Sequence, residues 1–193
     1  MTLRPIRWLA PLALALMIFV AASPAHAIDA VSVRSDAPAI DLTGILDHQH
    51  SDTDRIQVST APGTDGIVRR IEVRAREGGQ NWVVFALANN TDDQLDRLIV
   101  APHYRIVSSG LLWPDLGQSR IATITPSTGD RPERQESATA DVFRITLDPG
   151  AVITFVVELR TDKLPQLYLW EPDAYKDKVN SFTLYQGIVI GIS

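Results

Sequence analysis

Four side chains that can bind a metal lie close together in the segment 47–54. His48, His50, Asp52 and Asp54 stand at alternate positions there. Imidazole suits zinc or copper, and carboxylates suit calcium or manganese. A bound metal needs a defined number and geometry of ligands, and no partner ligand can be placed beside this set from the sequence. We therefore expect a solvated acidic loop without a metal, in which His48, His50 and Asp52 are the metal candidates.

Aromatic side chains offer a different chemistry, which is stacking against a sugar ring. Trp113 stands in a connection between Leu112 and Pro114, and Tyr104 lies in an expected strand. Aromatic faces with polar rims are suited to carbohydrates and other small ligands. Large aromatic side chains are mostly buried, so the competing interpretation is that Trp113 closes one end of the fold. We retain Trp113 and Tyr104 as ligand-binding candidates.

Two arginines in the polar stretch 126–139 are further candidates. A guanidinium group can hold a carboxylate or a phosphate through two parallel hydrogen bonds. Arg131 and Arg134 could do so, although Glu133 and Glu136 beside them also suit a merely solubilising surface. Arg131 and Arg134 therefore complete the set of ligand-binding candidates.

The sequence indicates no catalytic centre. After the leader the chain has three histidines, His48, His50 and His103, no cysteine and no Gly-x-Ser-x-Gly motif. The absence of cysteine excludes thiol catalysis, disulfides and cysteine-based metal sites. The acidic residues are scattered without a recognisable pair. We predict no catalytic residue and no cofactor, and a hydrolase remains the least favoured alternative.

The first 27 residues have the pattern of a secretory signal peptide. Arg4 and Arg7 precede an almost wholly apolar run at 8–20, and Ala25-His26-Ala27 is a small-x-small cleavage site. The two arginines are not adjacent, which favours general export over the twin-arginine route. An uncleaved anchor is the alternative, but the apolar run is short for a membrane span. We expect a mature chain that begins at Ile28 in a bacterial periplasm.

Charge excludes one class of partner. The chain has 18 Lys and Arg against 23 Asp and Glu, and removal of the leader leaves 16 against 23, a net charge of −7. A field of this sign does not attract nucleic acid or anionic lipid. The mature length suits one domain with a substantial core.

Short strands dominate the expected secondary structure, because alternating or continuous apolar runs recur every 8–12 residues with turn signals between them. This spacing predicts an all-β, jelly-roll-like sandwich. A helix is expected to start at 172–180, with Asp173 as a possible N-cap. Strands are expected at 40–46, 55–58, 67–76, 82–88, 95–100, 103–107, 120–125, 142–147, 151–160 and 167–170.

The C-terminal run 182–193 contains no charged residue. It is shorter than the roughly 20 apolar residues that cross a bilayer, so it cannot cross alone. It is either a final core strand or the first turns of a transmembrane helix. The polar segment 176–178 before it, and Gly187 and Gly191 in GxxxG spacing, favour the helix. We therefore divide the chain into a signal peptide at 1–27, a sandwich at 28–180 and the start of a truncated transmembrane helix at 181–193.

Three segments together resemble a known family. They are the run Asn-Trp-Val-Val-Phe-Ala-Leu-Ala-Asn-Asn-Thr at 81–91, the hairpin formed by 143–150 and 153–160, and Leu-Tyr-Gln-Gly-Ile-Val-Ile-Gly at 184–191. Their order resembles the extracellular β-sandwich of bacterial seven-transmembrane receptors with diverse intracellular signalling modules, over about residues 40–193. The resemblance implies a jelly-roll domain for carbohydrate-like or other small ligands that leads into a first membrane helix. It transfers no ligand residue to a position in this chain.

The resemblance also implies a signalling role. The seven helices and the cytosolic module of such receptors are not in this sequence. In such receptors the module is a histidine kinase, a nucleotide cyclase or a domain for cyclic-di-GMP turnover, and the composition favours the last of these. We expect a sensor on the periplasmic face of the inner membrane whose partner is a small molecule, a carbohydrate or a periplasmic protein. Binding would shift the population between two arrangements of sandwich and helix. The alternative is a free periplasmic carbohydrate-binding module.

Overall fold

Most of the described chain is β-structure. The computed structural model describes residues 27–106, 112–114 and 118–191. The strands are β1 (Ala30–Val33), β2 (Ala39–Asp41), β3 (Asp47–His50), β4 (Arg55–Ser59), β5 (Arg70–Arg74), β6 (Asn81–Asn89), β7 (Leu95–Pro102), β8 (Tyr104–Ile106), β9 (Leu112–Pro114), β10 (Ile121–Pro126), β11 (Glu133–Gln135), β12 (Ala140–Leu147), β13 (Val152–Leu159) and β14 (Tyr168–Trp170). A 3₁₀ turn at Thr43–Ile45 and helix α2 (Pro172–Gly191) complete the elements. The prediction of an all-β fold followed by a helix is confirmed.

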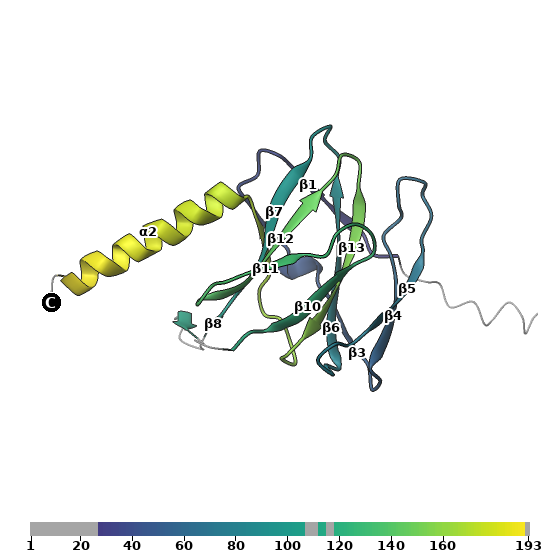
Figure 1. The fold of residues 1–193 in the computed structure, drawn as a ribbon, viewed down its shortest axis with the longest axis horizontal. Coiled ribbons are helices and arrows are strands. Elements are labelled where there is room, and N and C mark those ends of the chain that lie inside the picture. Colours follow the sequence, from purple (N-terminus) through teal and green to yellow (C-terminus); the bar gives the residue numbers. More distant parts are fainter. Residues whose placement is uncertain (1–26, 107–111, 115–117, 192–193) are drawn as a thin grey trace, which may run out of the picture.

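Two five-stranded sheets enclose the main core (Figure 1). Sheet A has the order β1-β6-β13-β10, with β3 also paired to β6, and sheet B has the order β11-β12-β7-β14-β2. Apolar side chains from both sheets belong to one buried cluster, within which the rings of Phe85 and Phe155 stack with centroids 5.3 Å apart. The jelly-roll connectivity itself stays a prediction.

Strand β6 is buried on both faces, as the continuous apolar run at 82–88 predicts. Successive side chains of a strand point to opposite faces, so Val83, Phe85 and Leu87 face sheet B while Trp82 and Val84 point the other way. The hairpin of β4 and β5 covers this second face. Ile56, Val58 and Val73 of the hairpin pack there against Trp82 and Val84.

The outer face of sheet B supports the C-terminal helix. Strands β7 and β12 pair antiparallel over their full lengths, and their outward side chains form a small apolar cluster. Trp170 and Tyr175 pack against this cluster. The cluster consists of Leu98, Val100, Ala140 and Val142.

Two segments expected to be irregular are strands. The start of the acidic segment 47–54 is β3, which pairs antiparallel with β6 and places His48 opposite Val83. Trp113, expected in a connection, belongs to β9, which pairs with β8. Edge strands are held by backbone hydrogen bonds, so a strand with two polar faces gives no apolar alternation in the sequence. For this reason the loop prediction for the start of the segment 47–54 was wrong. The connection predicted at Trp113 was also wrong, because a strand of three residues is too short to show a period.

Helix α2 begins at Pro172, the position where proline is well tolerated because its missing N–H would have no intrahelical partner. The capping side chain is that of Glu171, whose Oε2 accepts a hydrogen bond from the Ala174 amide at 2.7 Å. The expected cap, Asp173, instead lies in the first turn, because the helix starts two residues earlier than a cap at 173 requires. Since α2 extends to Gly191 and projects away from the sandwich, the strand interpretation of the C-terminal run is wrong (Figure 1).

The structure describes only some of the residues on which the membrane and export predictions depend. The proposed signal peptide falls almost entirely on residues 1–26, outside the described residues. Across the described ranges 27–106, 112–114 and 118–191, no helix has the length and apolar character to cross a membrane. The start of a transmembrane helix at 181–193 stays a prediction.

Candidate functional site

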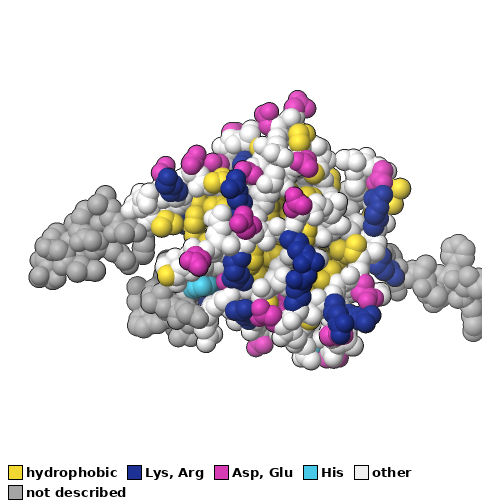
Figure 2. Space-filling model, viewed as in Figure 1, with side chains coloured by type: hydrophobic (Ala, Val, Ile, Leu, Met, Phe, Trp, Pro, Cys, Tyr) yellow, Lys and Arg dark blue, Asp and Glu magenta, His cyan; other side chains and the backbone are white. Residues whose placement is uncertain are grey.

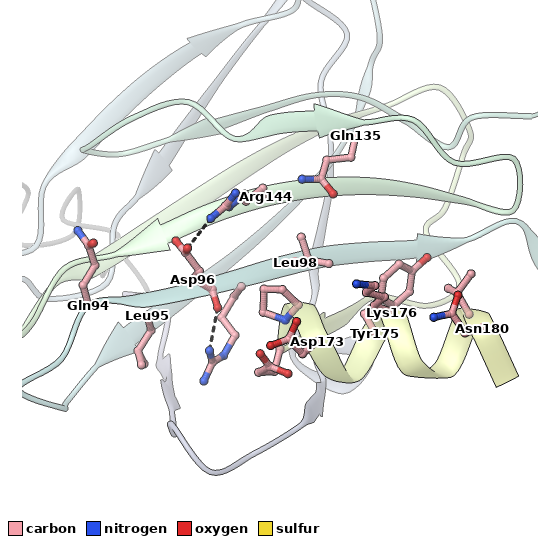
Figure 3. A pocket seen from close by; sticks show the side chains of 14 residues that line it. Gln94, Leu95, Asp96, Leu98, Gln135, Arg144, Asp173, Tyr175, Lys176 and Asn180 are labelled. Carbon is pink, nitrogen blue, oxygen red and sulfur yellow. Dashed lines mark hydrogen bonds and ion pairs between the residues drawn. The ribbon is translucent and has the colours of Figure 1, made fainter.

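A groove of about 670 Å³ lies where the outer face of sheet B meets helix α2 (Figure 3). One wall comes from β7, β12 and the edge strand β11, and the other from the first turns of α2. Figure 2 shows acidic and basic side chains interspersed over this side of the molecule, without a separate field of either sign. The sandwich and helix α2 thus form the groove together.

Aromatic contacts hold the base of α2 on the sheet. The rings of Trp170 and Tyr175 lie 6.0 Å apart at an interplanar angle of 57°. The ammonium group of Lys178 lies 4.5 Å from the centroid of the Trp170 ring, a cation–π contact. Together with the Glu171 cap, these contacts hold the first two turns of α2 on the sandwich, and the helix projects away from it beyond them (Figure 1).

An internal ion pair forms part of the groove floor. Asp96 accepts a hydrogen bond from Arg144 at 2.5 Å (Figure 3) and another from the Thr146 hydroxyl at 2.7 Å. The hydrogen bonds from Thr146 and Arg144 hold the pKa of Asp96 below its usual value. Because both charges are engaged with each other, this pair offers a ligand a nearly neutral surface.

Arg97 contributes a buried positive charge beside the floor. Its side chain is only 4% exposed and donates to the backbone carbonyl oxygens of Asp96 and Arg34 at 2.8 and 2.9 Å. Within the described chain no carboxylate lies at ion-pair distance from it. Burial lowers the pKa of Arg97, and the negative charge of Glu171 acts in the opposite direction.

Four polar side chains of the groove have no partner of their own. Asp173, Lys176 and Asn180 recur at i, i+3 and i+7, which places them on one face of α2. Gln135 faces them from β11 across the groove (Figure 3). None of these four side chains makes a hydrogen bond or ion pair with another described residue. Their hydrogen-bonding capacity is therefore available to a ligand.

The predicted arginines lie outside this groove. Arg134 donates to Oδ1 of the buried Asp141 at 2.8 Å and to the carbonyl oxygen of Ile121, and its guanidinium carbon lies 4.4 Å from the Phe143 ring centroid. Its hydrogen-bonding groups thus already serve the fold. Arg131 is exposed in the turn before β11. The structure does not bring Arg131 and Arg134 into the groove, and their binding role stays a prediction.

Asp141 is the centre of the network that engages Arg134. It is 2% exposed and accepts hydrogen bonds from the Ser119 hydroxyl and from the amides of Arg120 and Ile121. Burial raises the pKa of Asp141, but these bonds and the one from Arg134 outweigh it, so the pKa lies below the usual value. Nε2 of His103 lies 3.5 Å from Asp141 Oδ2, and neither ring nitrogen of this buried histidine has a hydrogen-bond partner among the described residues.

The aromatic and metal candidates are placed as follows. Tyr104 and Trp113 belong to the paired strands β8 and β9, but their side chains lie outside the described residues. His50 contacts Asn81 through Nδ1 at 2.8 Å and Asp52 through Nε2 at 3.3 Å. The hydrogen bond with Asn81, reinforced by Asp52 against the effect of burial, raises the pKa of His50. Among the described residues no group of three or more His, Asp or Glu side chains is arranged to hold a metal.

Sequence reasoning missed the groove. The helix-face spacing of Asp173, Lys176 and Asn180 is readable in the sequence and could have identified one wall. Gln135 and the Asp96–Arg144 pair could not have been placed opposite it, because their position depends on strand pairing over long sequence separations.

Comparison with known proteins gives one match. The family model described as 7TMR-DISM extracellular 2 matches residues 76–171, from the end of β5 to the residue that caps α2. The matched segment includes β6, β7, β12, β13 and β14, and therefore the sheet wall of the groove. No curated protein and no solved structure was found to match.

Proposed function

Residues 76–171 belong to the 7TMR-DISM extracellular 2 family, and from this premise we propose that the chain is the ligand-sensing part of a membrane-bound bacterial receptor. A domain of this family lies outside the cytoplasm and has no catalytic role. In our proposal the leader exports the chain, and α2 continues into the membrane. Binding of a small ligand outside the cell then changes how the sandwich and α2 are arranged.

This proposal is supported by the fact that the sandwich and helix α2 both line the groove. A ligand between Gln135 on the sheet and Lys176 on the helix contacts both parts at once. It can therefore prefer one arrangement over another, which is the requirement for a ligand to shift a conformational equilibrium. The start of α2 packs on the sandwich through Tyr175, and the helix then projects away, so a small change at its base is carried along the projecting helix (Figure 1).

A groove-filling substitution tests this coupling without knowledge of the ligand. Leu98 is 5% exposed and lines the groove floor, so Leu98→Trp places bulk where a ligand would lie. The chain contains no cysteine, and spin labels at Asp92→Cys and Ser181→Cys would therefore be unique. We expect Leu98→Trp to change the distance distribution between these two labels.

The control pair carries both labels on the sandwich, at Asp92→Cys and Lys163→Cys, and its distances should not change. If Leu98→Trp leaves the Asp92–Ser181 distances unaltered, the groove does not set the helix position and the coupling proposal fails. The membrane link has its own test in the reading frame after Ser193. Seven apolar spans there would support it, and an immediate stop codon would refute it.

The identity of the cytosolic signalling module and the class of the ligand are proposed from different observations. A cytosolic module for cyclic-di-GMP turnover is proposed from the sequence resemblance and would be identified by the same downstream frame. The carbohydrate-binding alternative rests on Trp113. Glycan binding that disappears in Trp113→Ala would favour it, whereas binding that survives this substitution would exclude that site.

A further inference from the structure

We infer that the groove between sheet B and α2 binds a small zwitterion of the α-amino-acid type, free or as a short peptide, with Asp173 and Lys176 holding its two charges. This inference rests on the proposed sensing role of the groove and gives it a ligand class. The ammonium group of the ligand would lie at Asp173 and its carboxylate at Lys176.

The separation of the two charges on the helix supports this assignment. Residues at i and i+3 have Cβ atoms about 5–6 Å apart on a helix surface, and Asp173 and Lys176 have this spacing in the first turns of α2. Both line the groove, yet they form no ion pair with each other or with any other described residue. Asp173 and Lys176 therefore present two opposite charges that are close enough together to contact the ammonium group and the carboxylate of one small zwitterion.

The charge balance of the lining excludes ions of one sign. Its described residues include three acids and three bases, so a phosphate or a polycation would find as much repulsion as attraction. A zwitterion can place each charge beside its opposite. The six charged residues are Asp96, Arg97, Arg144, Glu171, Asp173 and Lys176.

Polar groups farther along the groove fit the rest of such a ligand. Asn180 lies one turn beyond Lys176 on α2, and Gln135 faces the helix from β11 across the groove (Figure 3). Neither amide has a hydrogen-bond partner among the described residues. They can hydrogen-bond a peptide group or a polar side chain. The helix face from Asp173 to Asn180 extends about 10 Å at 1.5 Å per residue, and two or three extended residues span a similar length.

The same lining disfavours a sugar. A sugar ring is usually bound against an exposed aromatic face. Tyr175 is the only aromatic side chain among the described lining residues, and it packs against Trp170 and the apolar cluster of sheet B. The groove therefore provides charges and amides but no stacking platform.

The test measures binding to the whole chain by thermal shift and then by calorimetry. The probes are the twenty L-amino acids and dialanine. Each is compared with its N-acetyl amide derivative, which lacks the charges of the terminal amino and carboxylate groups. Glucose and galactose form a separate arm. We expect at least one zwitterion to raise the melting temperature and its neutral derivative to have no effect.

Matched variants locate the binding. Lys176→Met and Asp173→Asn should each weaken binding about tenfold or more, since each removes a charged hydrogen-bonding partner. Lys163→Met and Asp92→Asn remove the same charges at exposed positions outside the groove and should leave affinity unchanged. Because Asp173 also favours the helix N-terminus, Lys176→Met decides the result if Asp173→Asn loosens α2.

The inference is overturned if no zwitterion shifts the melting temperature, if the neutral derivatives bind equally well, if only the sugars bind, or if Lys176→Met leaves affinity unchanged. The spin-label experiment with Leu98→Trp separates this failure from that of the proposed function. A helix that responds to Leu98→Trp in a protein that ignores amino acids would retain the coupling role and reject the ligand class.

Discussion

Replacement of Asp141 by asparagine removes the charge at the centre of the buried network beside β10. In the native chain Oδ1 accepts from the Ser119 hydroxyl and Arg134 Nη1 at 2.7 and 2.8 Å. Oδ2 accepts from the amides of Arg120 and Ile121 at 2.6 and 3.0 Å. An asparagine has a single oxygen, so two of these four donors lose their acceptor and face the NH₂ group instead.

The size of the effect follows from these bonds. A hydrogen bond to a charged group is worth about 1.5–3 kcal/mol, and the bond from Arg134 counts for less because 41% of that side chain is exposed. We expect Asp141→Asn to lower the free energy of unfolding by about 2–4 kcal/mol at pH 7. Urea denaturation followed by tryptophan fluorescence measures this difference. Asp92→Asn, at an exposed position, is the matched control and should stay within about 0.5 kcal/mol of the native chain.

The pH dependence gives a second check. The pKa of Asp141 is lowered in the folded state, so its contribution is fully present above the unfolded-state pKa of about 3.9. That contribution is lost as the pH falls through the lower folded-state pKa. The stability gap between the native chain and Asp141→Asn should therefore be constant above about pH 5 and narrow below about pH 4. A gap below about 1 kcal/mol at pH 7, or one that persists unchanged at pH 3, would refute this reasoning.

Three further substitutions have defined outcomes. His103→Leu should raise the free energy of unfolding by about 1 kcal/mol, because neither ring nitrogen of this buried side chain is hydrogen-bonded to any residue that the structure describes. A loss of stability in urea would contradict this. Gly79→Ala should cost about 1–3 kcal/mol, since its Cβ would lie 2.9 Å from the Leu159 carbonyl oxygen, whereas Gly44→Ala, with nothing within 4 Å, should be nearly neutral. Glu171→Ala removes the α2 cap at a cost of about 1 kcal/mol, and amide exchange in the first turn should accelerate; unchanged exchange would count against the cap.

The sequence by itself determined the class of fold. The apolar run at 82–88 can only be buried on both faces, and it became the central strand of sheet A, with Trp82 against the β4–β5 hairpin and Phe85 in the main core. The start of α2 after Glu171 could also be predicted from the neighbouring residues, because proline and the helical period act within a few positions. Strand β3 escaped detection because its pairing with β6 leaves no apolar pattern in its own sequence.

The tertiary structure alone decided which polar side chains meet. Arg134 was readable as a free guanidinium, but the fold brings Asp141 to it across the β11–β12 hairpin and engages it. The groove exists because β7 and β12 pair residues that are 38 to 52 positions apart in the chain, and α2 packs on their outer face. Sheet faces are assembled from strands distant in the sequence, whereas a helix face is assembled from neighbours three and four residues apart. The residue spacing of the helical wall of the candidate site is therefore readable in the sequence, and only the fold placed the sheet wall opposite it.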